Sequence, residues 1–214
     1  FPEAGPRKDL VFPKSGKSLK IGIIVSGGIA PGINAVIDGI TQRHRMYATA
    51  HGYQVSVYGF KNGFQAFDDI HESIIMLATE EHEYKNKPQI VTSDFISSGG
   101  SIIGTSRFDD LINLRTRKSA LDHIVGELFD LKIDILYIIG GDGSMKAAHA
   151  LRSMAPQYAK ERGIQHNLSV VAIPKTMDND ILWVWQTFGF LSAVEKGREV
   201  IEALSTEVKS NPRL

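Results

Sequence analysis

The sequence predicts an α/β fold, a doubly wound and mostly parallel sheet with helices on both faces. Short apolar runs alternate along the chain with segments whose apolar residues have helical spacing, which is typical of βαβ units. The runs at 20–25 and 133–139 are almost continuously apolar, as expected for strands that are buried on both faces of a parallel sheet. Glycine-rich segments follow both runs, and open α/β sheets bind ligands at such strand ends.

In the first half of the chain, residues 1–18 contain three prolines and mixed charges, which favours an extended arm. The strand at 20–25 runs into a glycine-rich loop, and a helix to about His51 follows. Residues 54–60 alternate as a second strand. The pattern at 68–80 is ambiguous, and 81–87 reads as a charged loop.

In the second half, residues 97–107 form another glycine-rich stretch, and 119–131 has the apolar spacing of a helix. The strand at 133–139 leads through Gly140–Ser144 into a helix that we expect to end near Arg152. The apolar run 168–173 predicts a fourth strand, which Pro174 stops. A last helix is expected from Thr187–Phe190 to about Val208.

The composition excludes several classes of partner. Lys plus Arg and Asp plus Glu both number 24, so no net field recruits nucleic acid or an acidic membrane. The chain has no cysteine, which excludes disulfides and thiolate metal sites. No apolar run approaches ~18 residues, and the first residues lack the apolar core of a signal peptide. We therefore expect a soluble, cytoplasmic protein, and the missing initiator Met suggests trimmed ends.

The segment Pro174–Asp180 concentrates reactive groups at the end of a predicted strand. It supplies two carboxylates, an amine, a hydroxyl and an amide within seven residues, more than a surface turn needs. Asp178 and Asp180 would share a face in an extended segment and can diverge in a turn. If they diverge, one can face a sugar hydroxyl and the other a metal and phosphates.

Two glycine-rich loops suit phosphate. Gly27, Gly28 and Gly32 would leave backbone N–H groups accessible at a helix start, although a tight turn alone also explains them. Asp142 lies between glycines directly before a helix, where it could hold Mg²⁺ through water beside the N–H groups of Gly143 and Ser144. Ser144 could instead cap that helix.

The carboxyl ends of parallel strands share one edge of a sheet, so these loops should converge. We expect the aspartates at 142, 178 and 180 to meet in one cleft with Arg107. Lys175 and Arg107 are the candidate cations for phosphate, since both lie in these loops.

Together these segments resemble the phosphofructokinase family. Four motifs occur in order over nearly the whole chain: Ser26–Asn34 resembles the family's first phosphate loop, Gly99–Arg107 its arginine loop, Gly140–Ser144 its metal loop, and Pro174–Asp180 its catalytic segment, followed by Thr187-x-Gly189-Phe190. The resemblance implies transfer of the terminal phosphate of Mg-ATP to the C1 hydroxyl of fructose 6-phosphate, giving fructose 1,6-bisphosphate in glycolysis.

The resemblance also implies roles for individual residues. Asp178 matches the general base, and Thr176 matches a residue that steadies the transferring group and the sugar. Asp142 matches the magnesium-associated aspartate, with Asp180 in the same charge cluster and on the sugar side. The remaining matches are Gly27, Arg107 and Phe108 for the phosphates of the donor, Gly143 and Ser144 for the nucleotide, Lys175 for catalysis, and Arg213 for the 6-phosphate of a sugar in a neighbouring subunit.

The resemblance further implies that residues 19–214 form the domain that binds the phosphate donor, while the sugar-phosphate half of the family is largely absent. Alone, this domain should bind donor and metal but turn over poorly. A homo-oligomer, a dimer or tetramer with shared sites, is expected.

The donor and three alternative functions remain open. Lys175 stands where short bacterial ATP enzymes have glycine and often accompanies pyrophosphate use, but Gly143 leaves room for the α-phosphate of ATP. We therefore expect ATP, with pyrophosphate as the alternative. A non-catalytic regulatory subunit with this fold would be expected to lose an aspartate. Lipid and NAD kinases share only Gly140–Gly143, and a dinucleotide-binding domain would need an acid after the strand at 54–60.

Overall fold

The computed structural model describes residues 18–78, 89–107, 117–182 and 184–211. Its centre is a five-stranded sheet with the strand order β3-β2-β1-β4-β5. The strands are β1 (Ser18–Ser26), β2 (Gln54–Phe60), β3 (Ile74–Ala78), β4 (Ile135–Gly140) and β5 (Ser169–Pro174). All neighbours pair in parallel except β2 and β3, which are antiparallel. The predicted fold class is confirmed.

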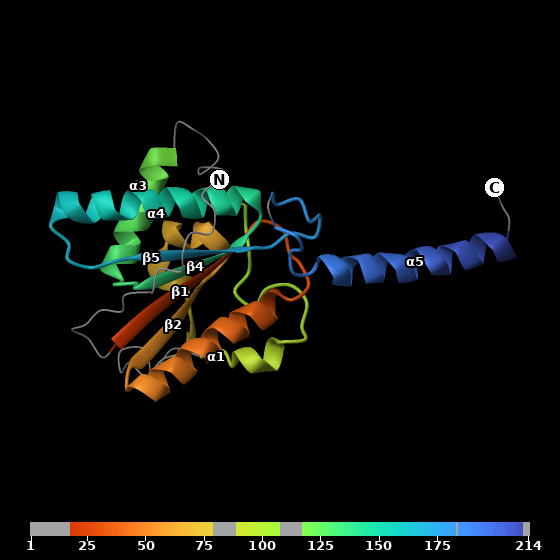
Figure 1. Cartoon of the computed structure of the whole chain (residues 1–214), viewed down its shortest axis with the longest axis horizontal. Helices are drawn as coiled ribbons and strands as arrows, with labels where there is room; N and C mark the ends of the chain where they lie inside the picture. The colour runs from red at the N-terminus through yellow and green to blue at the C-terminus, as the bar shows by residue number, and fades with distance from the viewer. Residues whose placement is uncertain (1–17, 79–88, 108–116, 183, 212–214) are drawn as a thin grey trace.

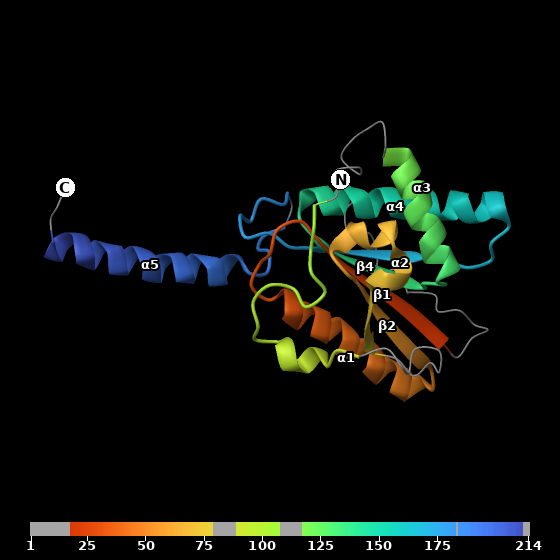
Figure 2. The same ribbon diagram turned by 180° about the vertical axis from the view of Figure 1, so that it is seen from behind.

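Helices cover both faces of this sheet (Figures 1 and 2). One face carries α1 (Ile33–His51) and the 3-10 helix η3 (Thr92–Phe95). The other carries η1 (Gly63–Asp68), α2 (Ile70–Ser73), α3 (Arg117–Asp130) and α4 (Asp142–Arg162). Short loops at the carboxyl ends of β1 and β4 lead into α1 and α4, and a longer segment joins β5 to α5 (Phe190–Ser210).

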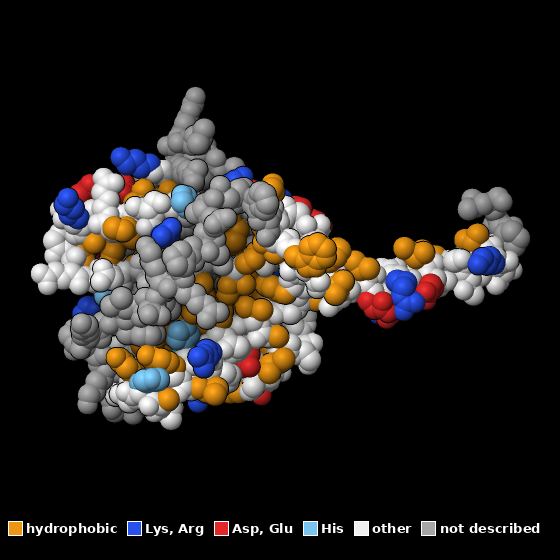
Figure 3. Space-filling view, viewed as in Figure 1, with side chains coloured by type: hydrophobic (Ala, Val, Ile, Leu, Met, Phe, Trp, Pro, Cys, Tyr) orange, Lys and Arg blue, Asp and Glu red, His pale blue; other side chains and the backbone are white. Residues whose placement is uncertain are grey.

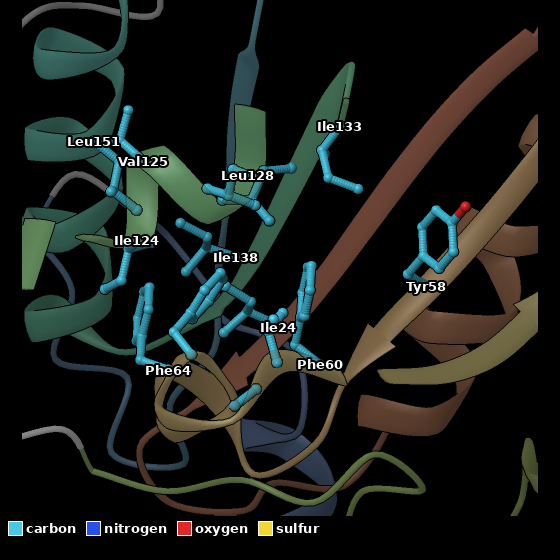
Figure 4. Packing of buried hydrophobic residues seen from close by; sticks show 14 of the residues in the cluster. Ile24, Tyr58, Phe60, Phe64, Ile124, Val125, Leu128, Ile133, Ile138 and Leu151 are labelled. Carbon is cyan, nitrogen blue, oxygen red and sulfur yellow. The ribbon is translucent and has the colours of Figure 1, made fainter. Parts of the chain in front are cut away.

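The alternation of side chains in β1 explains why two hydrophobic cores form. Ile21, Ile23 and Val25 are fully buried under α1, whereas Ile24 points to the opposite face. On that face Ile24 packs in the cluster that Figure 4 shows, where Phe60 and Phe64 lie among aliphatic side chains of α3, α4 and β4. A strand with both faces covered is stabilised by burial on each side, about 25 cal/mol per Å² of apolar surface.

The pairing register places the functional loops side by side. Ser26, the last residue of β1, pairs with Gly140 at the end of β4, and Gly140 pairs with Pro174 at the end of β5. Three adjacent strands therefore end at the same level. The loops that follow them begin next to one another, which is the condition for a shared site.

Several element boundaries differ from expectation. Helix α4 does not end near Arg152 but continues to Arg162, because Leu151, Ala155 and Ala159 extend its buried face. The ambiguous stretch 68–80 contains α2 and β3 within its described part. Ser18 belongs to β1, so the expected arm would end before it, and residues 1–17 lie outside the described part of the chain.

The last helix, α5 (Phe190–Ser210), projects away from the rest of the molecule (Figure 1). None of its residues is buried, and Figure 3 shows apolar side chains along its exposed surface. Arg198 pairs with Glu195 and Glu202 on the helix surface, and such pairs stabilise an isolated helix only slightly. Among the described helices, none has the length and apolar character needed to cross a membrane.

Candidate active site

A cleft of about 510 Å³ lies at the carboxyl ends of β1, β4 and β5. Its walls come from three loops, residues 26–29, 141–144 and 175–178, together with Arg107 and Asp180. Segments that are up to about 150 residues apart in sequence meet there, as the alignment of the strand ends requires. The structure thus brings the predicted aspartates and cations, together with Gly27, Gly28 and Gly143, into one cavity.

In the first loop, backbone and side-chain hydrogen bonds join residues 26–27 to the loop that carries Arg107. The N–H of Gly27 donates to the carbonyl oxygen of Ser106 at 3.0 Å, and the hydroxyl of Thr105 donates to the carbonyl oxygen of Gly27 at 2.7 Å. The expectation that Gly27 offers an accessible N–H is therefore wrong, because Ser106 already accepts it. Gly28 faces open space, and Gly32 does not line the cleft.

Asn34 holds the start of the arginine loop through two hydrogen bonds. Its side chain is 1% exposed at the start of α1, where its amide donates to the carbonyl oxygen of Ser98 at 3.0 Å. The N–H of Ile102 in turn donates to Asn34 Oδ1 at 2.9 Å. A single buried side chain thus holds both sides of a glycine-rich turn, and Arg107 at the end of this loop lines the cleft.

Asp142 opens helix α4 at the edge of the cleft. Its carboxylate is 60% exposed and pairs with Lys146 at 2.6 Å. The helix is capped by Gly141 without a side-chain hydrogen bond, so the suggestion that Ser144 caps it is wrong. The first N–H groups of an α-helix have no acceptor within the helix, and those of α4 begin at residues that line the cleft. The partial positive charge of the helix end also favours an anion there.

Close approach of β4 and α4 explains Gly140. A Cβ atom at this position would lie 2.2 Å from Ser144 Oγ and 2.8 Å from the carbonyl oxygen of Ser26. Any side chain at 140 would push the metal loop away from the first loop. The glycine is required for the spacing of the two walls.

Lys175, the second residue of the catalytic segment, is 3% exposed. Its backbone N–H donates to the carbonyl oxygen of Gly140, and its amine donates to the carbonyl oxygen of Gly28. Burial lowers the pKa of the Lys175 amine. The amine lies between the catalytic segment and the first loop, where a phosphate oxygen can compete for it.

Asp178 and Asp180 both line the cleft and both are exposed. The backbone of Asn179 between them has a left-handed conformation, with φ 52°, so the segment is a turn rather than an extended strand. The N–H of Asp178 donates to Thr176 Oγ1 at 3.1 Å. In this bond the Thr176 hydroxyl acts as the acceptor, so it can still donate its own proton.

The carboxylates fit a magnesium ion bound together with phosphates. Among the described residues, no group of three or more His, Asp or Glu side chains could hold a metal by protein ligands alone. Asp142, Asp178 and Asp180 nevertheless line the same cleft. Mg²⁺ in phosphate-transfer sites takes one or two carboxylates, with water and substrate phosphates as its other ligands.

Nine predicted site residues line the cleft: Gly27, Arg107, Asp142, Gly143, Ser144, Lys175, Thr176, Asp178 and Asp180. Phe108 and Arg213 lie outside the described residues. Ala147 in the helix after the metal loop and Met177 in the catalytic segment also line the cavity, and so does Phe64, which the sequence did not indicate. Phe64 comes from η1 and is 1% exposed, and nothing in its sequence context separates it from an ordinary core residue.

Curated proteins similar to this chain carry one name. The chain is 31% identical over 213 residues to an ATP-dependent 6-phosphofructokinase of Amycolatopsis methanolica, covering 99% of this chain and 39% of the relative. It is 32% identical over 195 residues to an ATP-dependent 6-phosphofructokinase of Buchnera aphidicola, covering 91% of this chain and 50% of the relative. The chain therefore spans half or less of the length of these curated relatives.

Solved structures share the fold. The phosphofructokinase of Saccharomyces cerevisiae superposes with a TM-score of 0.72 at 24% identity, over 90% of this chain and 24% of the other. A pyrophosphate-dependent phosphofructokinase from Marinobacter aquaeolei gives a TM-score of 0.67 at 22% identity, over 90% of this chain and 42% of the other. The family model for phosphofructokinase matches residues 20–214, which span all four motifs and the cleft. The chain belongs to the phosphofructokinase family.

Proposed function

We propose that this chain is the donor-binding part of a 6-phosphofructokinase. In this proposal, the terminal phosphate of Mg-ATP moves to the C1 hydroxyl of fructose 6-phosphate. The observation that carries the proposal is the convergence of Asp178, Asp142 and Arg107 on one cleft with the N-terminus of α4. A homo-oligomer remains a prediction from the resemblance, and a cytoplasmic location remains a prediction from the composition.

The chemistry needs a base, a countercharge and a fixed donor. Asp178 accepts the proton of the C1 hydroxyl while the hydroxyl oxygen forms a bond to the terminal phosphorus of ATP. The bond between that phosphorus and the bridging oxygen breaks, and ADP leaves. Phosphoryl transfer has a loose transition state, so positioning and countercharge provide most of the rate enhancement. Arg107, the buried amine of Lys175 and the N–H groups that open α4 supply positive charge to the phosphates.

Asp142, together with Asp180, would hold Mg²⁺ at this site. The ion, when bound, neutralises negative charge on the phosphate oxygens. In the structure the Asp142 carboxylate pairs with Lys146, and both side chains are largely exposed. Replacing Lys146 with a cation bound to the donor costs little free energy, because an exposed ion pair contributes only about 0–1 kcal/mol.

Three features support ATP as the donor. The two curated relatives above are ATP-dependent by name. A side chain at Gly143 would meet no atom within 4 Å, so the helix start is open where the rest of a nucleotide would continue. Ala147 lines the same cavity one turn further along α4 and leaves more space there than a longer side chain would.

Lys175 is the feature that favours pyrophosphate as a second candidate donor. Its amine already lies against the first loop and would add one positive charge to the phosphate site. Turnover of fructose 6-phosphate by the full-length gene product, measured with Mg-ATP and with Mg-pyrophosphate, separates the two donors. Activity with pyrophosphate alone contradicts the ATP assignment.

The base assignment is tested by Asp178→Ser. This variant should lower turnover by about 10²- to 10⁴-fold, the usual contribution of a positioned base, while Mg-ATP binding stays near the wild-type affinity. Asp130→Ser is the matched control, because Asp130 is exposed at the end of α3, at the opposite edge of the sheet. Wild-type turnover by the Asp178 variant contradicts the assignment, and a wild type without any phosphate transfer to the sugar contradicts the proposed function.

A further inference from the structure

The segment Trp185–Gly189, which we call the clasp turn, has polar interactions that the proposed function does not use. Thr187 is 2% exposed, and its hydroxyl donates to the carbonyl oxygen of Thr176 at 2.6 Å. Its N–H donates to Asn179 Oδ1 at 2.8 Å. The Asn179 amide completes the arrangement by donating to the carbonyl oxygen of Trp185 at 3.1 Å.

These hydrogen bonds attach the catalytic segment to the clasp turn on both sides of Asp178. One attachment point, Thr176, lies two residues before it, and the other, Asn179, lies directly after it. Neither Thr187 nor Asn179 lines the cleft, so neither has access to a substrate there. Their bonds instead fix the backbone of the short exposed turn that carries the carboxylate.

The clasp turn is itself held against the first phosphate loop. Gly189 has φ 86°, and a Cβ atom there would lie 2.7 Å from the carbonyl oxygen of Pro31. Phe188 forms a β-bridge with Lys175 and approaches within 3.4 Å of the position of a Cβ at Gly32. The turn therefore links the segment that carries the base to the loop that faces the phosphates.

We propose that Thr187 and Asn179 are positioning residues that hold the Asp178 carboxylate at a fixed place relative to the first phosphate loop. This inference rests on the proposed function, since it takes Asp178 as the base. A misplacement of about 1 Å at a reacting group can lower a rate by about 10²-fold. Without the clasp, only the N–H bond from Asp178 to Thr176 restrains the exposed apex of the turn among the described contacts.

The test compares Thr187→Val with Thr187→Ser in the full-length gene product. Valine matches threonine in shape but lacks the hydroxyl, whereas serine keeps it. We expect Thr187→Val to lower kcat for phosphate transfer to fructose 6-phosphate by about 10²-fold, with little change in the KM for the donor. Thr187→Ser should restore most of the loss. Gln186→Ala is the matched control, because Gln186 is exposed in the same turn and lies outside the cleft.

A second variant covers the case in which Thr187→Val does not fold. Asn179→Gly removes the amide without backbone strain, because glycine readily adopts φ near 52°. It should lower kcat in the same direction. Hydrogen exchange of the peptide 174–182 should become faster in both variants and stay unchanged in Gln186→Ala.

The outcomes separate the two proposals. Wild-type kcat in Thr187→Val or in Asn179→Gly, or a Thr187→Ser variant as slow as Thr187→Val, overturns the positioning role. A wild type that transfers no phosphate to the sugar overturns the proposed function instead. In that case the hydrogen exchange of the peptide 174–182 alone decides whether the clasp turn orders this segment. Equal exchange rates in all variants overturn the positioning role.

Discussion

His44 should make the stability of this protein fall steeply in mild acid. It lies on the buried face of α1, is 6% exposed, and has its Nε2 atom 2.8 Å from the hydroxyl of Tyr137 in β4. Burial, together with the nearby positive charge of Arg43, lowers the pKa of His44 from 6.5 to about 4. The imidazole is therefore neutral in the folded protein over a range in which the unfolded chain binds a proton.

The sign and size of the effect follow from this difference. Between pH 6.5 and about 4 the unfolded state holds the extra proton, so the free energy of unfolding decreases as the pH falls. At 1.36 kcal/mol per pKa unit, the full loss is about 3 kcal/mol. Asp134 acts in the opposite direction, because burial raises its pKa and the folded state takes up its proton first. A comparison of variants cancels that contribution.

The assay is urea unfolding of the wild type and of His44→Gln at pH values above 6.5 and near 4. Glutamine keeps a polar partner for Tyr137 but does not titrate, so the variant should lose about 3 kcal/mol less over this interval. His51→Gln, which removes an exposed histidine from the same helix, is the matched control. Equal pH dependence in the wild type and His44→Gln would refute the reasoning.

Three further predictions test the loops and the last helix. Gly189→Ala should cost ~1–3 kcal/mol in urea unfolding, because alanine is strained at φ 86° and its Cβ would approach Pro31; unchanged stability would contradict the close contact. Asn34→Ala should cost about 1–3 kcal/mol in urea unfolding and weaken donor binding in calorimetry, since the loop that carries Arg107 loses its two hydrogen bonds to Asn34; wild-type affinity would contradict the coupling. Amides of α5 should exchange far faster than those of β1, because a helix of 21 residues without buried side chains is marginal in water; equal protection would mean that α5 is packed.

Sequence patterns predicted the sheet well where burial is symmetrical. The nearly continuous apolar runs of β1 and β4 could hardly be anything but central strands. Prediction failed where tertiary contacts decide the structure. The antiparallel strand β3 depends on pairing with β2, and the last ten residues of α4 depend on burial of Ala155 and Ala159. A short window of sequence shows neither the pairing of β3 with β2 nor the burial of Ala155 and Ala159.

The site was predictable to a similar extent. Residue types at strand ends indicated which side chains belong to the cleft, because strand ends share an edge of the sheet. The sequence could not show which backbone N–H groups already donate hydrogen bonds within the protein. The N–H of Gly27 bonds to Ser106, almost 80 residues later, and only the folded chain reveals this pair. His44 gave no signal either, since its low pKa comes from burial against a different layer.

Hydrogen bonds between residues far apart in the sequence help the cleft to keep its shape. Asn34 ties α1 to the arginine loop, Thr105 ties that loop to Gly27, and Lys175 ties the first loop to the catalytic segment. Most of these bonds use backbone groups as one partner, so they order the walls without adding negative charge that would repel phosphate. The charged side chains Arg107, Asp142 and Asp178 stay at the surface of an already ordered cavity, where binding a phosphate donor costs little further ordering.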